Sequence, residues 1–256
     1  MSVVANSKIN QLLMNTDHKG LLFSGWLKAQ GYSDQLQKRY RDSGWFTALS
    51  HGVMYRTGSK LSAFSALATC NMQTGTKHRI AAHSALEYAG FNHYVPMGKP
   101  TLAIALYNTK HRPSWMKDDV FDVIFRTFYT EMFPEPEVIQ KVEKHGVLYI
   151  SSPEQAFLEC LLLAPKYYDY MDLYYIMEQL TTLRSDVVQR LLETSKNFSV
   201  KRMFLYMAEK AGHYWFEELD LEKINIGTSK IQLVPEGTYV AKYLITVPKA
   251  LNSYEG

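Results

Sequence analysis

Between residues 24 and 56 the hydrophobic positions change from a helical spacing to a period of two. Two short helices are expected first, because Ser24 and Ser33 are suited to helix caps and Gly31 to a left-handed helix end. After Gly44 the apolar positions alternate along two strands joined by a short turn. The pattern therefore predicts a helix, a tight turn, a second helix and a β-hairpin.

The second of these helices has an apolar side and a basic side. Leu36 and Tyr40 lie four residues apart and are expected to pack inward. A step of about 100° per residue then directs Lys38 and Arg41 outward. Three further long polar side chains are expected on the flanks: Gln35, Gln37 and Arg39. Lys and Arg neutralise phosphates, and long amide and guanidinium groups reach base edges in the major groove, so the pattern favours a recognition helix on duplex DNA.

A single charged helix face is more often just a solvated surface, and an ordinary helical subdomain would explain it. The ordered combination of helix, turn, basic helix and hairpin is what favours DNA. A preceding helix over Lys8–Met14 would complete a three-helix winged module that ends near Gly58.

Charge is distributed unevenly along the chain. Residues 1–100 contain eleven Lys and Arg against four Asp and Glu, a net charge of +7. Residues 101–256 contain seventeen against twenty-one, a net charge of −4. This asymmetry suits an amino-terminal part that faces DNA and a body that meets something else.

The remaining pattern mixes helices and strands without an internal repeat. Further helices are expected over 59–69, 78–89, 153–163, 169–183, 185–194 and 200–210, strands over 101–107, 120–128 and 147–150 in a mixed sheet, and a terminal hairpin over 231–247. The predicted class is α+β: a winged helix-turn-helix over 1–60, then a larger mixed α/β domain over 61–256 with a C-terminal β-hairpin, 61–75 forming the connector.

Chemistry-bearing motifs are weak throughout. Cys70 and Cys160 stand apart, which argues against a disulfide framework or a zinc site. No glycine-serine turn precedes paired carboxylates, which a nucleotidyltransferase needs to hold magnesium. We therefore expect no enzyme, no metal and no cofactor. No stretch approaches the roughly 18 apolar residues that span a bilayer, so a soluble cytoplasmic protein is predicted.

Four stretches together resemble the AbiEi family of antitoxins from type IV toxin–antitoxin systems. They are GYSDQLQKRYRDSGWFTALSHGVMYR, HRIAAHSALEYAGF, ISSPEQAFLECL and PEGTYVAKYLITVP. The resemblance implies a transcriptional autorepressor that binds inverted repeats of double-stranded DNA at its own promoter. It also implies an antitoxin that counters a cognate nucleotidyltransferase-like toxin of an abortive infection system.

The resemblance places DNA contacts on the second helix and the wing. These residues are Ser33, Gln35, Gln37, Lys38, Arg39, Arg41, His51 and Arg56. The wing turn is weakly basic, because it carries His51 where related proteins often carry Arg. An alternative of another class is a winged-helix module that docks to protein and never to DNA.

Overall fold

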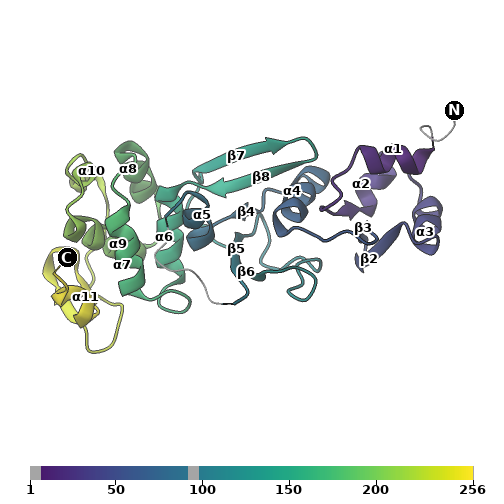
Figure 1. Ribbon diagram of the computed structural model, residues 1–256. Helices are drawn as coiled ribbons and strands as arrows, with labels where there is room; N and C mark the ends of the chain where they lie inside the picture. Colours follow the sequence, from purple (N-terminus) through teal and green to yellow (C-terminus); the bar gives the residue numbers. More distant parts are fainter. Residues whose placement is uncertain (1–6, 92–97, 256) are drawn as a thin grey trace. The chain divides into compact units, whose positions relative to one another are not determined.

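A computed structural model describes residues 7–91 and 98–255 and confirms the α+β class (Figure 1). The chain divides into two compact units. Unit 1 comprises Met1–Ile80, Pro96–Tyr129 and Gln140–Ile150, and unit 2 comprises Ala81–Val95, Thr130–Ile139 and Ser151–Gly256.

Unit 1 begins with the expected winged helix-turn-helix. Its elements are α1 (Lys8–Met14), β1 (Leu22–Phe23), α2 (Ser24–Ala29), α3 (Asp34–Asp42), β2 (Phe46–Ser50) and β3 (Val53–Arg56). The three strands form a small antiparallel sheet in the order β1-β3-β2. The sequence pattern predicted the hairpin of β2 and β3 but not β1. Gly31 has the predicted left-handed conformation, with φ of +83°. The Ser33 side chain caps α3 by accepting the Leu36 N–H, as expected.

Ser24 was expected to cap α2, and this expectation is wrong. Phe23 occupies the cap position without a side-chain bond, and Ser24 is the first helical residue. The strand β1 runs directly into α2, so Ser24 lies one position further into the helix than its side chain suggested.

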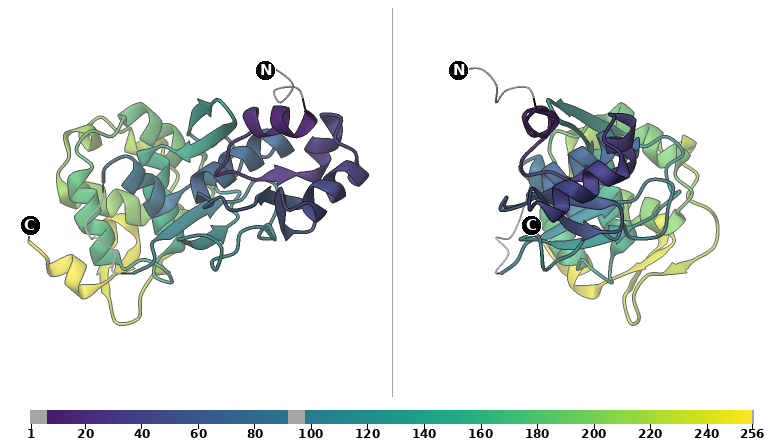
Figure 2. Two further views of the ribbon diagram at one scale, coloured as in Figure 1. Left: turned by 45° about the vertical axis from the view of Figure 1, so that its right-hand side comes forward. Right: turned by 90° about the vertical axis from the view of Figure 1, so that its right-hand side faces the viewer.

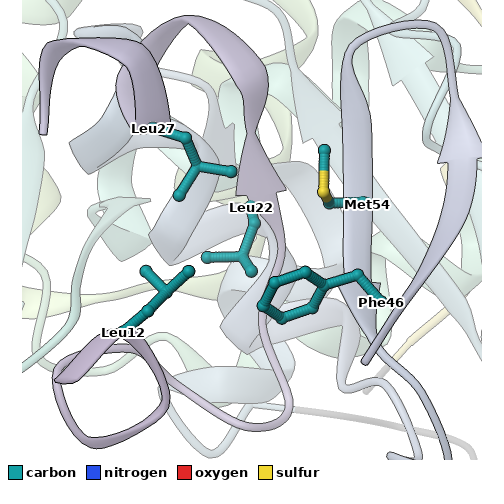
Figure 3. Packing of buried hydrophobic residues seen from close by; sticks show 5 residues of the cluster. All are labelled: Leu12, Leu22, Leu27, Phe46 and Met54. Carbon is teal, nitrogen blue, oxygen red and sulfur yellow. The ribbon is translucent and has the colours of Figure 1, made fainter. Parts of the chain in front are cut away.

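One hydrophobic cluster holds the winged helix together. Figure 3 shows its five buried members converging from both helices and strands: Leu12, Leu22, Leu27, Phe46 and Met54. Tyr40 of α3 packs edge-on against Phe46 of β2, with ring centroids 5.9 Å apart. Because α1, α2, α3 and the wing share this core, the position of α3 depends on all of them.

Helix α4 (Ala63–Thr74) is bonded closely to β1, although the sequence suggested a connector over 61–75. The Thr69 hydroxyl accepts the Leu21 N–H at 2.9 Å. The Gln73 amide accepts from Phe23 N and donates to Leu21 O, both at 2.9 Å. Helix α4 therefore serves as a second support of the winged helix, and the domain boundary at residue 60 stays a prediction.

A five-stranded mixed sheet follows; the sequence pattern predicted a mixed sheet with three of these strands. Its strands are β4 (Arg79–Ile80), β5 (Thr101–Ala105), β6 (Ile124–Phe128), β7 (Val138–Glu143) and β8 (Gly146–Ser151), in the order β6-β5-β4-β8-β7. Strand β4 pairs antiparallel to β5 and parallel to β8. The helix expected over 78–89 is therefore shorter: its first residues form β4, and α5 spans Ala82–Tyr88. Strand β7 has mostly exposed side chains and was not predicted.

In unit 2, α9 packs against α6 and α7, while α6 also packs against α5 and α8. The helices from residue 153 onward lie together in both views of Figure 2. They are α6 (Pro153–Leu163), α7 (Tyr170–Gln179), α8 (Ser185–Thr194), α9 (Phe198–Ala211), α10 (Tyr214–Glu217) and α11 (Lys249–Ser253), with short 3-10 turns η1 (Leu221–Lys223) and η2 (Ala241–Tyr243). The predicted start of α6 is confirmed, with Ser152 as cap and Pro153 in the first turn.

The C-terminal strands differ in detail from the expected hairpin. The antiparallel pair consists of β10 (Thr238–Val240) and β11 (Ile245–Val247), joined through η2. Strand β9 (Ile231–Gln232) was expected to form the first hairpin strand, but it adds to β11 in parallel. The 3-10 turn reverses the chain after Val240, so the long strand expected over 239–247 is divided in two.

Buried polar residues of the ISSPEQAFLECL stretch bond to other segments of unit 2. Glu154 is almost fully buried and accepts from Arg184 through its side-chain Nε at 3.0 Å and its backbone N at 3.1 Å. Glu159 is fully buried, and it accepts from Ala82 N, Gln155 Nε2 and the Ser151 hydroxyl. Buried polar groups need such partners, so this motif is structural.

Replacing Glu154 with Gln should make the protein less stable at neutral pH but not in acid. Burial alone raises the pKa of Glu154, but the hydrogen bonds from Arg184 outweigh it and lower the pKa. A carboxylate with a lowered folded pKa stabilises above its unfolded pKa, and this contribution is lost as pH falls through the folded value. Urea unfolding should show E154Q less stable by about 1–3 kcal/mol at pH 7, with the gap closing below about pH 4. The exposed Glu222→Gln should change little at either pH; a pH-independent gap for E154Q would contradict this account.

Candidate nucleic-acid interface

Ser24 joins the three elements that shape the outer face of the winged helix. Its backbone N–H donates to Gly52 O in the wing turn at 2.8 Å. Its hydroxyl donates to Gln37 Oε1 of α3 at 2.7 Å, and its carbonyl accepts from Gln37 Nε2 at 3.2 Å. These bonds fix the start of α2, the middle of α3 and the tip of the wing to one residue.

Gln37 lies in the interior of the winged helix, so the prediction that places it on a flank of the helix as a DNA contact is wrong. Only 2% of it is exposed, and its Nε2 also donates to Tyr32 O at 2.8 Å. With its amide oxygen and nitrogen both bonded inside the protein, the side chain cannot reach a base edge. Gln37 therefore shapes the interface without belonging to it.

Because Gln37 is buried, the exposed basic face of α3 is rotated about the helix axis relative to the predicted one. The buried side lies between Gln37 and the half-buried pair Leu36 and Tyr40. Gln35, Lys38 and Arg39 are then the exposed long polar side chains, and each is exposed in the structure. Arg41, expected to point fully outward, is half-buried on the flank toward the wing.

The half-buried tyrosines beneath this face stay neutral. Burial raises the pKa of Tyr32 above its usual value, and it raises the pKa of Tyr40 as well, where the charge of Arg39 works in the opposite direction. The phenols therefore add no negative charge beside the basic residues at neutral pH.

A hollow of about 530 Å³ lies between α2, α3 and the wing. Arg41 lines it from α3, His51 from the wing turn, and Lys28 from α2. The structure thus brings Arg41 and His51 together across the hollow. The other exposed predicted residues lie elsewhere: Gln35, Lys38 and Arg39 on the outer side of α3, Ser33 at its cap, and Arg56 at the end of β3, opposite Phe46.

Ion pairing leaves the basic face of α3 uncompensated. Asp34, at the first turn of α3, pairs with Lys28 at 2.8 Å, so its charge is balanced. Within the described residues, Lys38, Arg39 and Arg41 have no carboxylate within ion-pair distance. The sequence pattern did not single out Lys28 as the ion-pair partner of Asp34. The only sequence signal for this pair is their opposite charge on either side of the α2–α3 turn.

The net charges of the two units differ more than those of residues 1–100 and 101–256 do. Unit 1 has seventeen Lys and Arg against seven Asp and Glu, a net charge of +10. Unit 2 has eleven against eighteen, a net charge of −7. The positive field that attracts a polyanion therefore belongs to the unit that carries the winged helix.

Other kinds of site find little support in the described part of the chain. Across residues 7–91 and 98–255, no three or more His, Cys, Asp or Glu side chains gather where they could hold a metal ion. Cys70 and Cys160 are buried free thiols, and burial raises the pKa of each. None of the described helices combines the length and apolar character of a membrane crossing.

Comparison with known proteins agrees with these features. The family model described as the N-terminal domain of the AbiEi antitoxin, a transcriptional regulator, matches residues 5–97. The model described as the AbiEi antitoxin and transcriptional regulator of a type IV toxin–antitoxin system matches residues 99–248. The fold is similar to the crystal structure of the RV2827C protein from Mycobacterium tuberculosis, with a TM-score of 0.57 and 15% identity over 94% of this chain and 90% of that one. No curated protein sequence matches the chain.

Replacing Gln37 with Ala should destabilise the winged helix, whereas Gln35→Ala should not. The Gln37 variant leaves the Ser24 hydroxyl and two carbonyls without their partner, which costs about 1–3 kcal/mol. Gln35 is exposed, so its removal should change stability by no more than about 0.5 kcal/mol. Denaturant unfolding of the full chain, with hydrogen exchange of α3 amides, measures both. Equal stability of the two variants would show that the bonds of Gln37 do not hold α3.

Proposed function

The chain belongs to the AbiEi family of transcriptional regulators and antitoxins of type IV toxin–antitoxin systems, and we propose that it represses its own promoter by binding duplex DNA. The observation that carries this proposal is the exposed, unpaired basic face of α3 beside the wing, in a unit with a net charge of +10. Inverted repeats are the proposed operator.

The outer face of α3 supplies the proposed contacts in the major groove. Lys38 and Arg39 are exposed, and Gln35 lies near the amino end of the helix, which is the part of a recognition helix that meets base edges. An amide such as that of Gln35 can bond adenine, and the two cations suit guanine or phosphate. Asp34 does not oppose this approach, because Lys28 balances its charge.

The flanking contacts are proposed for phosphates. Arg41 and His51 line the same hollow from α3 and from the wing turn, so both can meet one stretch of backbone. Arg56 is exposed at the end of β3. The Ser33 hydroxyl oxygen accepts the Leu36 N–H, and its own hydrogen is the group that would donate to a phosphate. A DNA contact through Ser33 stays a prediction.

Removing the charges of Lys38 and Arg39 together should weaken promoter binding. The duplex immediately upstream of the chain's own coding sequence is the probe, and fluorescence anisotropy over a salt series is the measurement. Each phosphate contact contributes about 0.9 to the slope of log K against log salt, and each base contact contributes about 1–3 kcal/mol. The K38Q/R39Q variant should therefore bind more weakly, with a smaller slope if the cations meet phosphates.

The matched control is K196Q/K249Q, which removes two exposed cations from unit 2 and should bind like wild type. Wild-type affinity in K38Q/R39Q would remove α3 from the interface. If the wild-type chain bound no duplex DNA at low salt, a winged helix that docks only to protein would be the correct account.

We propose that the same chain counters a cognate toxin of the nucleotidyltransferase type, in keeping with the family. The family is one of regulators and antitoxins, and we propose that the chain has no catalytic activity of its own. Because a promoter-bound regulator acts where the chromosome lies, its proposed location is the cytoplasm.

The antitoxin proposal is tested by growth. Expression of the neighbouring toxin reading frame alone should arrest cells, and co-expression of this chain from an unrelated promoter should restore growth. The unrelated promoter separates neutralisation from repression of the toxin gene. Persistent arrest at matched protein levels would refute the antitoxin part and leave the repressor part standing.

A further inference from the structure

The wing itself is poor in cations. Residues 46–55, which include the whole turn and β2, contain no Lys or Arg, and His51 is their one basic residue. Arg56 follows only at the end of β3. A wing that meets the phosphate backbone needs positive charge near its tip, because phosphate contacts are made mainly by Lys and Arg.

A lysine from another part of unit 1 reaches this tip. Lys117 lies in the loop between β5 and β6, and its Nζ donates to Leu49 O of the wing at 2.8 Å. Both residues belong to unit 1. Figure 1 shows the β5–β6 loop on the side of β2 and β3.

A β-bulge explains why the Leu49 carbonyl is open to this contact. The register of β2 against β3 shifts between Ala48 and Ser50, so Leu49 is the extra residue of the bulge. The extra residue of a bulge is left unpaired in the ladder. The Leu49 side chain is buried in the unit, and its carbonyl oxygen finds its partner in Lys117.

The loop holds Lys117 in place through its neighbours. Trp115 and Met116, directly before it, are each only 2% exposed. Trp115 packs edge-on against Phe121 and Phe125, with ring centroids about 6 Å apart. The position of Lys117 is therefore set by buried aromatic packing.

The charge of Lys117 is available to a ligand. The residue is exposed, and in the described part of the chain no carboxylate lies within ion-pair distance of its Nζ. The adjacent Asp118 pairs instead with Arg112 at 2.7 Å, and its hydrogen bond from Phe125 N, together with Arg112, lowers its pKa. An ammonium group has three donors, and Leu49 O takes one, so two remain.

We propose that Lys117 is a DNA-phosphate contact, through which the β5–β6 loop supplies the cation that the wing lacks. The proposal rests on the proposed DNA binding of this chain and extends its interface beyond the winged helix. The contact is independent of base sequence, so it strengthens binding to any duplex.

Salt dependence tests the proposal with the full chain, using the upstream duplex and an unrelated duplex of equal length. K117Q should lower the slope of log K against log salt by about 0.9 on both duplexes. The ratio of wild-type to variant affinity should then fall about threefold between 50 and 200 mM salt. K117R keeps the charge and should retain the wild-type slope, and K249Q, which removes an exposed cation of unit 2, should also retain it.

The melting temperature of each variant, compared with its salt slope, distinguishes a lysine that contacts DNA phosphate from one that only stabilises the fold. A lower melting temperature in K117Q with a wild-type salt slope would overturn the proposal, because Lys117 would then only satisfy the bulge carbonyl. If K117Q proves too unstable to assay at room temperature, the salt series is repeated at low temperature. A slope lower than that of wild type by about 0.9 would then support the contact, and a wild-type slope would overturn it. Failure of wild type to bind either duplex would instead refute the proposed function itself.

Discussion

The outer face of the winged helix depends on one junction, the bonds between Ser24, Gln37 and Gly52. The hydrophobic cluster beneath fixes which elements pack together, but apolar contacts are not directional. The hydrogen bonds of Ser24 supply direction, because they tie the rotation of α3 and the position of the wing turn to the same residue. A slip of α3 by one residue would break the two bonds between Gln37 and Ser24 and leave buried polar atoms unsatisfied, which is costly in a low-dielectric interior.

Local signals predicted much of this arrangement. The cap at Ser33, the left-handed Gly31 and the start of α6 at Ser152 and Pro153 depend on residues within one turn of each other, so the sequence displays them directly. The main error at the candidate site has a clear cause. A glutamine looks like a surface residue in a periodicity argument, and only the distant backbone groups it bonds make Gln37 a buried one.

Long-range strand pairing was less predictable from the sequence, because the groups that bond to each strand lie far from it along the chain. Strand β4 consists of Arg79 and Ile80 and lies between β5 and β8, so its partners are far along the chain and its own length gives no periodic signal. The parallel addition of β9 to β11 depends on tertiary packing in the same way. The hydrogen bond from Lys117 to Leu49 of the wing joins residues 68 positions apart, and the local sequence around either residue does not predict it.

Charge and structure together divide the work of the molecule. The sequence showed only a basic first part and an acidic remainder, whereas the fold gathers basic residues from three separate segments into unit 1 and leaves unit 2 with a net charge of −7. The net negative charge of unit 2 disfavours phosphates, so the charge distribution favours unit 1 as the DNA-facing part and unit 2 as the part that meets a different kind of partner. Under the proposed function, the opposite net charges of the two units favour DNA binding on unit 1, because the net negative charge of unit 2 repels phosphates.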